Sequence, residues 1–179
     1  MNAANDDLKA LIRTIPDFPR PGIQFRDITT LLLDAHGFEA AIERLAERVG
    51  EKADLIAAIE ARGFVVGAAL APLLGAGLLL IRKAGKLPGA TIDEEYALEY
   101  GTDQLAMHVD ACAPGARVWI ADDLIATGGT ALAAARLIRR AGATVAGAVF
   151  IIDLPDLGGS GKLRAEGIRV ETLVEFEGD

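Results

Sequence analysis

The sequence predicts an α/β protein with a mostly parallel central sheet and helices on both faces. Short apolar runs alternate with amphipathic stretches in the order strand, helix, strand, strand, helix, strand, which is typical of parallel sheets. Most of the strand runs are apolar throughout, as expected when a sheet is covered on both sides. The length of 179 residues, with 51% hydrophobic and 25% charged residues, fits one globular domain spanning residues 1–179.

The first helix that this pattern predicts covers residues 38–49. Apolar residues return there every three or four positions, and the charged residues face elsewhere. The apolar face consists of Phe38, Ala41, Ile42, Leu45 and Val49. The run DLIAAI at residues 54–59 follows and predicts a short buried strand.

An uncharged stretch from Gly63 to Ile81 is long enough to be considered as a membrane span. Pro72 and several glycines interrupt it, and the sequence has no second stretch of this kind. We therefore expect no membrane partner. The stretch instead predicts a buried helix over about residues 64–74, a glycine turn and a buried strand over about residues 77–82.

Three strands and a helix are predicted in the second half of the chain. The run RVWIA at residues 117–121 predicts a strand ending at Asp122, and residues 145–152 predict another buried strand. Between them, the apolar residues of 131–141 share one helical arc, and Gly142 is the residue type that commonly follows a helix. Residues 168–175 alternate between apolar and charged, which predicts a half-exposed strand near a sheet edge.

Two segments fall outside this regular pattern. Residues 1–33 form an irregular N-terminal arm. Residues 83–104 connect two predicted buried strands and contain glycines, a proline and a small hairpin-like stretch around residues 96–100. A connection of this length inside a compact domain is usually a functional lid or a flexible excursion, so we expect a flexible loop here.

Charge and cysteine content exclude several classes of protein. The formal net charge is −8 and no run of Lys or Arg appears, so a nucleic-acid partner that needs a basic face is not expected. The single cysteine, Cys112, excludes an internal disulfide and a thiolate zinc cluster. Residues 1–11 carry charges and lack the apolar region of a signal peptide, so we expect a cytoplasmic location.

The most informative stretch is VWIADDLIATGGT at residues 118–130. Glycines let backbone N–H groups approach a phosphate closely, threonines add hydroxyl donors, and a following helix N-terminus adds free N–H groups. The stretch therefore predicts a phosphate-binding loop, made by Ala126, Thr127, Gly128, Gly129 and Thr130. The alternative is an ordinary strand–turn–helix connection in which Asp and Thr are turn and cap residues.

Asp122 and Asp123 stand just before this loop. Because like charges repel, we do not expect them to bind phosphate; they can accept hydrogen bonds from sugar hydroxyls, or hold Mg²⁺ directly or through water. Ligands of open α/β sheets bind at the carboxyl ends of strands, where this pair is predicted to lie. Elsewhere, GGSGK at residues 158–162 looks like a Walker loop, but Asp156 and Leu163 stand where that motif requires Gly and Ser or Thr.

The stretch VWIADDLIATGGT resembles the phosphoribosyl-pyrophosphate (PRPP) motif of type I phosphoribosyltransferases. Three further stretches resemble the adenine phosphoribosyltransferases of that family. They are IRTIPDFPRPGIQFRDI at 12–28, the adenine-side segment; EARGF at 60–64, the pyrophosphate loop; and IRKAGKLP at 81–88 with YALEYGT at 96–102, the flexible catalytic loop. The resemblance implies the type I phosphoribosyltransferase fold, with a small N-terminal hood over about residues 1–33 and a flexible catalytic loop over about residues 83–104.

The resemblance also implies a reaction, the transfer of the 5-phosphoribosyl group of PRPP to adenine, which gives AMP and pyrophosphate. It implies Mg²⁺ as the cofactor and a homodimer as the assembly. By position, residues 126–130 would hold the 5′-phosphate, and Asp122 and Asp123 would contact the ribose hydroxyls. The residues implied to meet pyrophosphate are Arg62, Arg82, Lys83 and Lys86.

On the base side, the resemblance implies that Phe25 stacks on adenine, with Arg26 and Arg62 beside it. Glu99 would be the catalytic carboxylate near the purine, and Tyr100 belongs to the same loop. No residue is assigned as a direct metal ligand. One departure is the start of the pyrophosphate loop, where Glu60 and Ala61 replace the Asp-Ser of some members; we expect it to be tolerated because the backbone does most of the binding there.

Other interpretations remain open at this point. Phe25 could anchor the arm in the core, and Glu99 could belong to a solvated acidic loop. The alternative functions are an oxopurine phosphoribosyltransferase, a non-catalytic PRPP-sensing regulator and a plain nucleotide-binding module. The adenine-type arm argues against the first. The negative charge argues against the second, because such a regulator needs a surface for nucleic acid.

Overall fold

The structure is a computed structural model that describes residues 5–50, 52–98 and 101–178. In chain order its elements are α1 (Asp6–Ala10), β1 (Arg13–Pro16), β2 (Gln24–Asp27), α2 (Thr29–Leu33), α3 (Ala35–Val49), β3 (Leu55–Ile59), α4 (Arg62–Leu73), β4 (Gly77–Lys83), β5 (Thr91–Leu98), β6 (Gly101–His108), β7 (Arg117–Ile125), α5 (Gly129–Arg140), β8 (Thr144–Asp153), a short 3₁₀ turn (Pro155–Leu157), α6 (Gly159–Ala165) and β9 (Val170–Glu175).

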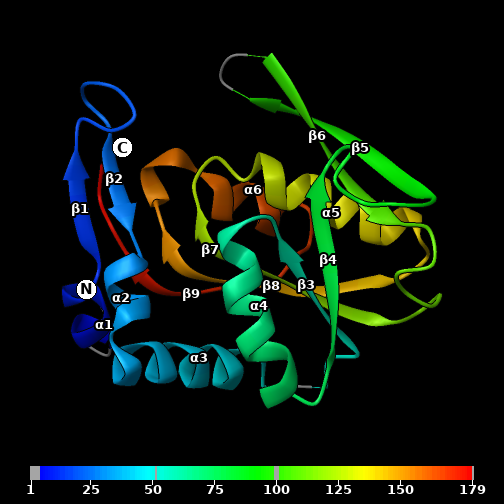
Figure 1. The fold of residues 1–179 in the computed structure, drawn as a ribbon, viewed down its shortest axis with the longest axis horizontal. Coiled ribbons are helices and arrows are strands. Elements are labelled where there is room, and N and C mark those ends of the chain that lie inside the picture. The colour runs from blue at the N-terminus through cyan, green and yellow to red at the C-terminus, as the bar shows by residue number, and fades with distance from the viewer. Residues whose placement is uncertain (1–4, 51, 99–100, 179) are drawn as a thin grey trace.

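A seven-stranded sheet in the order β5-β6-β4-β3-β7-β8-β9 forms the centre of the described chain (Figure 1). Strands β4, β3, β7, β8 and β9 run parallel to one another, while β6 pairs antiparallel with β4 and with β5. The predicted α/β class with a mostly parallel sheet is confirmed. The alternating segment near the C-terminus forms β9 at the edge of the sheet, as predicted, although the strand begins at Val170.

Helices cover both faces of the sheet. Alternate residues of a strand point to opposite faces, so β7 and β8 each contribute to two cores. Ile120 of β7 and Phe150 of β8 belong to the core under α5 and α6. Trp119 and Ile151, their neighbours in sequence, belong to the second core, under α3 and α4. The carboxyl ends of the parallel strands therefore open between two helical layers.

The uncharged stretch 63–81 divides into α4 and β4, as predicted. Helix α4 begins two residues earlier than expected, at Arg62. No helix among the described residues is long and apolar enough to cross a membrane.

Residues 83–104, where we expected a flexible loop with a small hairpin-like stretch, contain a longer hairpin than expected. Most of the segment belongs to the antiparallel pair β5–β6, which extends the sheet beyond β4. The reason is visible at Glu94 of β5. Its carboxylate is only 18% exposed because it pairs with Arg136 and Arg140 of α5, so a polar strand packs against that helix.

Strand β7 is also longer than predicted. It continues through Asp122 and Asp123 to Ile125, because β8 is long enough to pair with it up to Asp153. The two carboxylates therefore lie within the strand and not after it.

The N-terminal arm is a separate two-stranded hairpin, β1–β2, beside the main sheet (Figure 1). The C-terminal segment that follows β9 holds it in place. The ring of Phe176 lies 4.7 Å from Lys9 Nζ and 4.5 Å from Arg26 Cζ. Arg26 also donates to the Glu177 carbonyl oxygen at 3.0 Å. The two ends of the described chain thus stabilise each other.

Candidate active site

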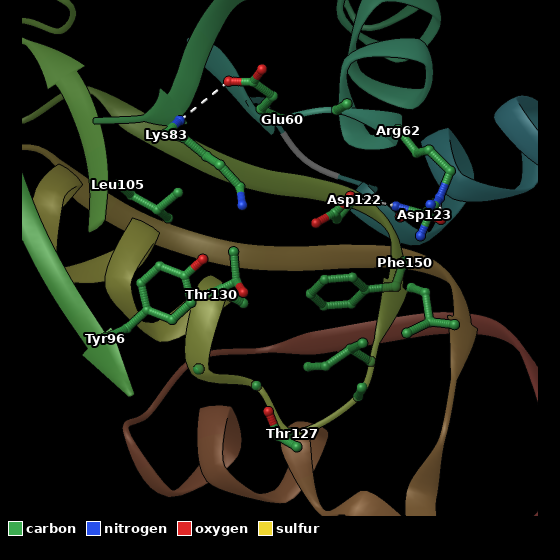
Figure 2. Close-up of a pocket in the computed structure, with 17 residues that line it drawn as sticks. Glu60, Arg62, Lys83, Tyr96, Leu105, Asp122, Asp123, Thr127, Thr130 and Phe150 are labelled. Carbon is green, nitrogen blue, oxygen red and sulfur yellow. Dashed lines mark hydrogen bonds and ion pairs between the residues drawn. The ribbon is translucent and has the colours of Figure 1, made fainter. Parts of the chain in front are cut away.

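A pocket of about 350 Å³ opens at the carboxyl ends of β3, β4 and β7. Three stretches of sequence meet in it, as Figure 2 shows: the connection from β3 to α4, strand β4 with the β5–β6 hairpin, and the end of β7 with the start of α5. This is the edge at which open α/β sheets bind their ligands.

The lower wall of the pocket is the predicted phosphate loop. Gly128 has φ +80 and precedes the first turn of α5, so a side chain here would be strained as well as crowded against Gly159. No side chain caps the first N–H groups of α5. These donors and the positive end of the helix dipole are therefore available to an anion.

The carboxylate pair lies at the end of β7 that faces the pocket. Asp123 is 4% exposed, and its Oδ2 accepts a hydrogen bond from Arg62 Nε at 2.5 Å. Burial raises the pKa of Asp122 well above its usual range, and the neighbouring charge of Asp123 raises it further. A Cβ at Gly63 would come within 2.7 Å of Asp122 Oδ1, so the close approach of α4 to this carboxylate requires glycine.

Arg62 joins the pocket to the N-terminal arm. Its guanidinium carbon lies 5.5 Å from the centre of the Phe25 ring, and Phe25 in turn meets Phe18 edge to face at 5.2 Å. Phe18 is 51% exposed, so the pair is not a core anchor. Burial opposes the charge of Arg62, but Asp123 and Asp122 outweigh it and raise the pKa of Arg62 above its ordinary value.

The adjacent cations Arg82 and Lys83 point to opposite sides of β4. Arg82 donates two hydrogen bonds to Glu60, both at 3.0 Å, and a third to the Lys86 carbonyl oxygen. Lys83 extends into the pocket (Figure 2), where its Nζ lies 3.0 Å from Asp103 Oδ2. Tyr96 donates to the same carboxylate at 3.2 Å.

Of the residues predicted for the site, the pocket thus unites Arg62, Lys83, Asp122, Asp123 and residues 126–130. Arg82, Lys86 and Phe25 do not line it, and the Arg26 side chain turns away toward Thr14 and the C-terminal segment. Glu99 and Tyr100 lie outside the described residues. Sequence reasoning missed the pocket residues Tyr96, Leu105 and Phe150, because strands far apart in the chain bring them there.

Comparison with known proteins matches residues 29–166 to the phosphoribosyl transferase domain family. An adenine phosphoribosyltransferase of Sphingopyxis alaskensis is 60% identical over 174 residues, which cover 97% of this chain and 95% of that protein. The chain belongs to the adenine phosphoribosyltransferase family. The resemblance of its sequence motifs is thereby confirmed.

Crystal structures of adenine phosphoribosyltransferases share the fold over nearly the full length. The enzyme of Thermoanaerobacter pseudethanolicus is 50% identical with a TM-score of 0.92, covering 96% of this chain and 99% of that one. The enzyme of Saccharomyces cerevisiae, in complex with an imino-altritol bisphosphate and adenine, is 36% identical with a TM-score of 0.89, covering 97% of this chain and 100% of that one. The type I phosphoribosyltransferase fold is confirmed.

Proposed function

We propose that this protein transfers the 5-phosphoribosyl group of PRPP to adenine and releases AMP and pyrophosphate. The observation that carries the proposal is the composition of the pocket. A glycine loop at a helix N-terminus, a carboxylate pair and the cations Arg62 and Lys83 surround one cavity. These groups match, in order, a phosphate, a sugar with free hydroxyls and a second phosphate group.

In this arrangement the 5′-phosphate of PRPP binds the loop 126–130, where N–H groups and the hydroxyls of Thr127 and Thr130 donate to it. The ribose hydroxyls donate to Asp122 and Asp123, which must be ionised to accept fully. The pyrophosphate group lies between the 60–62 connection and Lys83. Arg62 turns from its bond with Asp123 toward the ligand. Its side chain is 47% exposed, so it has space to reorient.

Displacement at the anomeric carbon passes through an oxocarbenium-like state, in which the leaving pyrophosphate gains negative charge. Arg62 and Lys83 favour the reaction because they stabilise that charge more strongly in the transition state than in the ground state. The purine proton is lost as the N-glycosidic bond forms, and we assign its removal to Glu99, as the resemblance of its sequence motif implies.

The adenine ring fits beside Phe25 in this proposal. Phe25 lies next to Arg62, so a purine stacked on the ring would stand within reach of a sugar held by Asp123. The phosphoribosyl transferase domain match begins at residue 29 and leaves out the arm that carries Phe25. Support for adenine as the base therefore comes from the full-length relatives.

Mg²⁺ is the cofactor that we propose. Among the described residues no group of three or more His, Cys, Asp or Glu side chains could hold a metal ion. Asp122 and Asp123 are adjacent carboxylates that line the pocket, and Mg²⁺ is often held by one or two carboxylates together with substrate phosphates. The residues present therefore fit a Mg²⁺ ion that arrives with PRPP, near Asp122 and Asp123, and adds positive charge to the leaving group.

We further propose that the protein is a homodimer in the cytoplasm. Apolar side chains of α4 and β4 lie exposed on one side of the molecule: Val65, Leu73, Leu78 and Leu80. Contiguous apolar surface of this kind usually marks an interface. The two elements are adjacent, since Leu78 approaches Gly67, and a second copy of the chain could cover both.

The test is release of pyrophosphate from PRPP and Mg²⁺ with one purine base at a time. We expect release with adenine, accompanied by an equal amount of AMP. A higher rate with hypoxanthine, guanine or xanthine would instead identify an oxopurine enzyme. Binding of PRPP without release from any base would favour the sensing regulator.

A further inference from the structure

The segment GGSGK, which fails as a Walker loop, lies directly behind the proposed phosphate loop. In Figure 2 the loop at Thr127 lies between the pocket and the helical ribbon of this segment. Gly159 N donates to the Ala126 carbonyl oxygen at 3.0 Å. A Cβ at Gly159 would come within 2.2 Å of that oxygen, so only glycine permits the contact.

A buried hydrogen bond fixes the start of α6 in this place. Ser160 Oγ donates to Asp153 Oδ2 at 2.6 Å, and both residues are less than 5% exposed. Asp153 ends β8, so the bond ties α6 to the central sheet. The segment is therefore a fixed support for the loop.

Lys162 acts on the loop from this support. Its Nζ donates to the Thr127 carbonyl oxygen at 3.0 Å. In a trans peptide the carbonyl and the following N–H point in opposite directions, so this bond also sets the direction of the Gly128 N–H. Residues 124–131 carry no charged side chain. Lys162 therefore supplies a positive charge directly behind the Thr127–Gly128 peptide, which lines the pocket.

We propose that Lys162 is a positioning residue for the 5′-phosphate, which it serves by holding the Thr127–Gly128 peptide and by adding positive charge behind the loop. This inference rests on the proposed function. The proposed pyrophosphate site is formed by other segments, the 60–62 connection and Lys83, and no contact among the described residues joins Lys162 to them.

The experiment compares Lys162→Met with Lys162→Arg in both directions of the reaction. Lys162→Met should raise KM for PRPP and, in the reverse direction, for AMP by about tenfold, as for the loss of a charged hydrogen bond. KM for pyrophosphate in the reverse direction should not change. Lys162→Arg keeps the charge and a hydrogen-bond donor, so its KM for PRPP and for AMP should stay close to those of the wild type.

Lys52→Met is the matched control. Lys52 is exposed, and among the described contacts its Nζ pairs only with Asp54, which precedes β3 at the end of the sheet opposite the pocket. This variant also removes one lysine charge, and it should leave KM for PRPP, AMP and pyrophosphate unchanged. Unchanged KM for AMP in Lys162→Met, or an equal rise for AMP and pyrophosphate, would overturn the inference. If Lys162→Met does not fold, Lys162→Gln must show the same selective loss.

Failure of the proposed function has a separate signature. Wild-type protein that forms no AMP from adenine and PRPP would refute the transferase before any variant is made. Calorimetric binding of AMP and of pyrophosphate to the wild type and to Lys162→Met then still tests whether Lys162 acts on the phosphate loop alone.

Discussion

Arg82 binds the Glu60 carboxylate through two parallel hydrogen bonds, both 3.0 Å long, at the point where β3 leads into α4. The hydrogen bonds from Arg82, with a bond from the Lys83 N–H and the charge of Arg82, hold the pKa of Glu60 below its ordinary value against the effect of burial. Arg82 thereby fixes the connection that lines the pocket, although its own side chain does not line it.

We therefore predict that Arg82 acts through Glu60. Arg82→Gln and Glu60→Gln should each raise KM for PRPP by about tenfold, and the double variant should be little worse than either. Steady-state kinetics of the three variants measure this coupling. Additive losses would show that Arg82 contacts pyrophosphate directly.

The second prediction concerns the bond between Asp123 and Arg62. Asp123→Asn removes the buried partner of a charged pair and a proposed acceptor for the ribose, so kcat/KM should fall by about a hundredfold. Glu171→Gln is the control. Glu171 lies on β9 and pairs with Arg48 of α3 and with Arg169, and none of the three lines the pocket. Equal losses in the two variants would disprove the assignment of Asp123 to the sugar.

The third prediction follows from the raised pKa of Asp122. A carboxyl with a higher pKa in the folded state binds more protons there than in the unfolded chain. Its ionisation therefore lowers the free energy of unfolding as the pH rises from the ordinary carboxyl range through the raised value.

Asp122→Asn should consequently raise Tm at pH 8 and lower activity. The gain in Tm should shrink as the pH falls toward 4, where the wild-type carboxyl is protonated in the folded state. Thermal melts across this range check it, with the exposed Asp110→Asn as the control. A gain that does not vary with pH would contradict the interpretation.

The fourth prediction tests the proposed dimer. Leu80→Glu places a charge in the exposed apolar surface of α4 and β4 and should yield a monomer in sedimentation velocity. Val109→Glu changes an apolar residue that is also exposed, at 51%, but lies beyond β6; this variant should remain a dimer. A wild-type mass near one chain would refute the dimer itself.

The sequence predicted the parallel strands and their helices well, because their apolar patterns are long and regular. It missed β5, where Glu94 occupies a largely enclosed position and resembles a loop residue. Two arginines of α5, Arg136 and Arg140, pair with this carboxylate and stabilise it there. Only the tertiary structure brings them close to β5. A polar strand supported by distant ion pairs carries no local signal.

Within the site, the proposed phosphate loop is recognised from its glycines and threonines, residues that also fit an ordinary strand–turn–helix connection. The different directions of Arg82 and Lys83 also follow from a rule available in the sequence. Successive strand residues face opposite sides, so Lys83 shares the face of buried Ile81 and Arg82 does not. The contributions of Tyr96 and Phe150 required the order of the strands, which no local pattern specifies.

The contact between Arg26 and Glu177 also bears on the synthesis of the protein. The hairpin that carries Phe25 leaves the ribosome early, but the carbonyl that holds it belongs to a residue 151 positions later. Phe176, which lies against the same guanidinium, is equally late. A nascent chain can assemble its phosphate loop while the base-side hairpin still lacks its support. Under the proposed function, the part of the site assigned to the base is therefore completed after the part assigned to the 5′-phosphate.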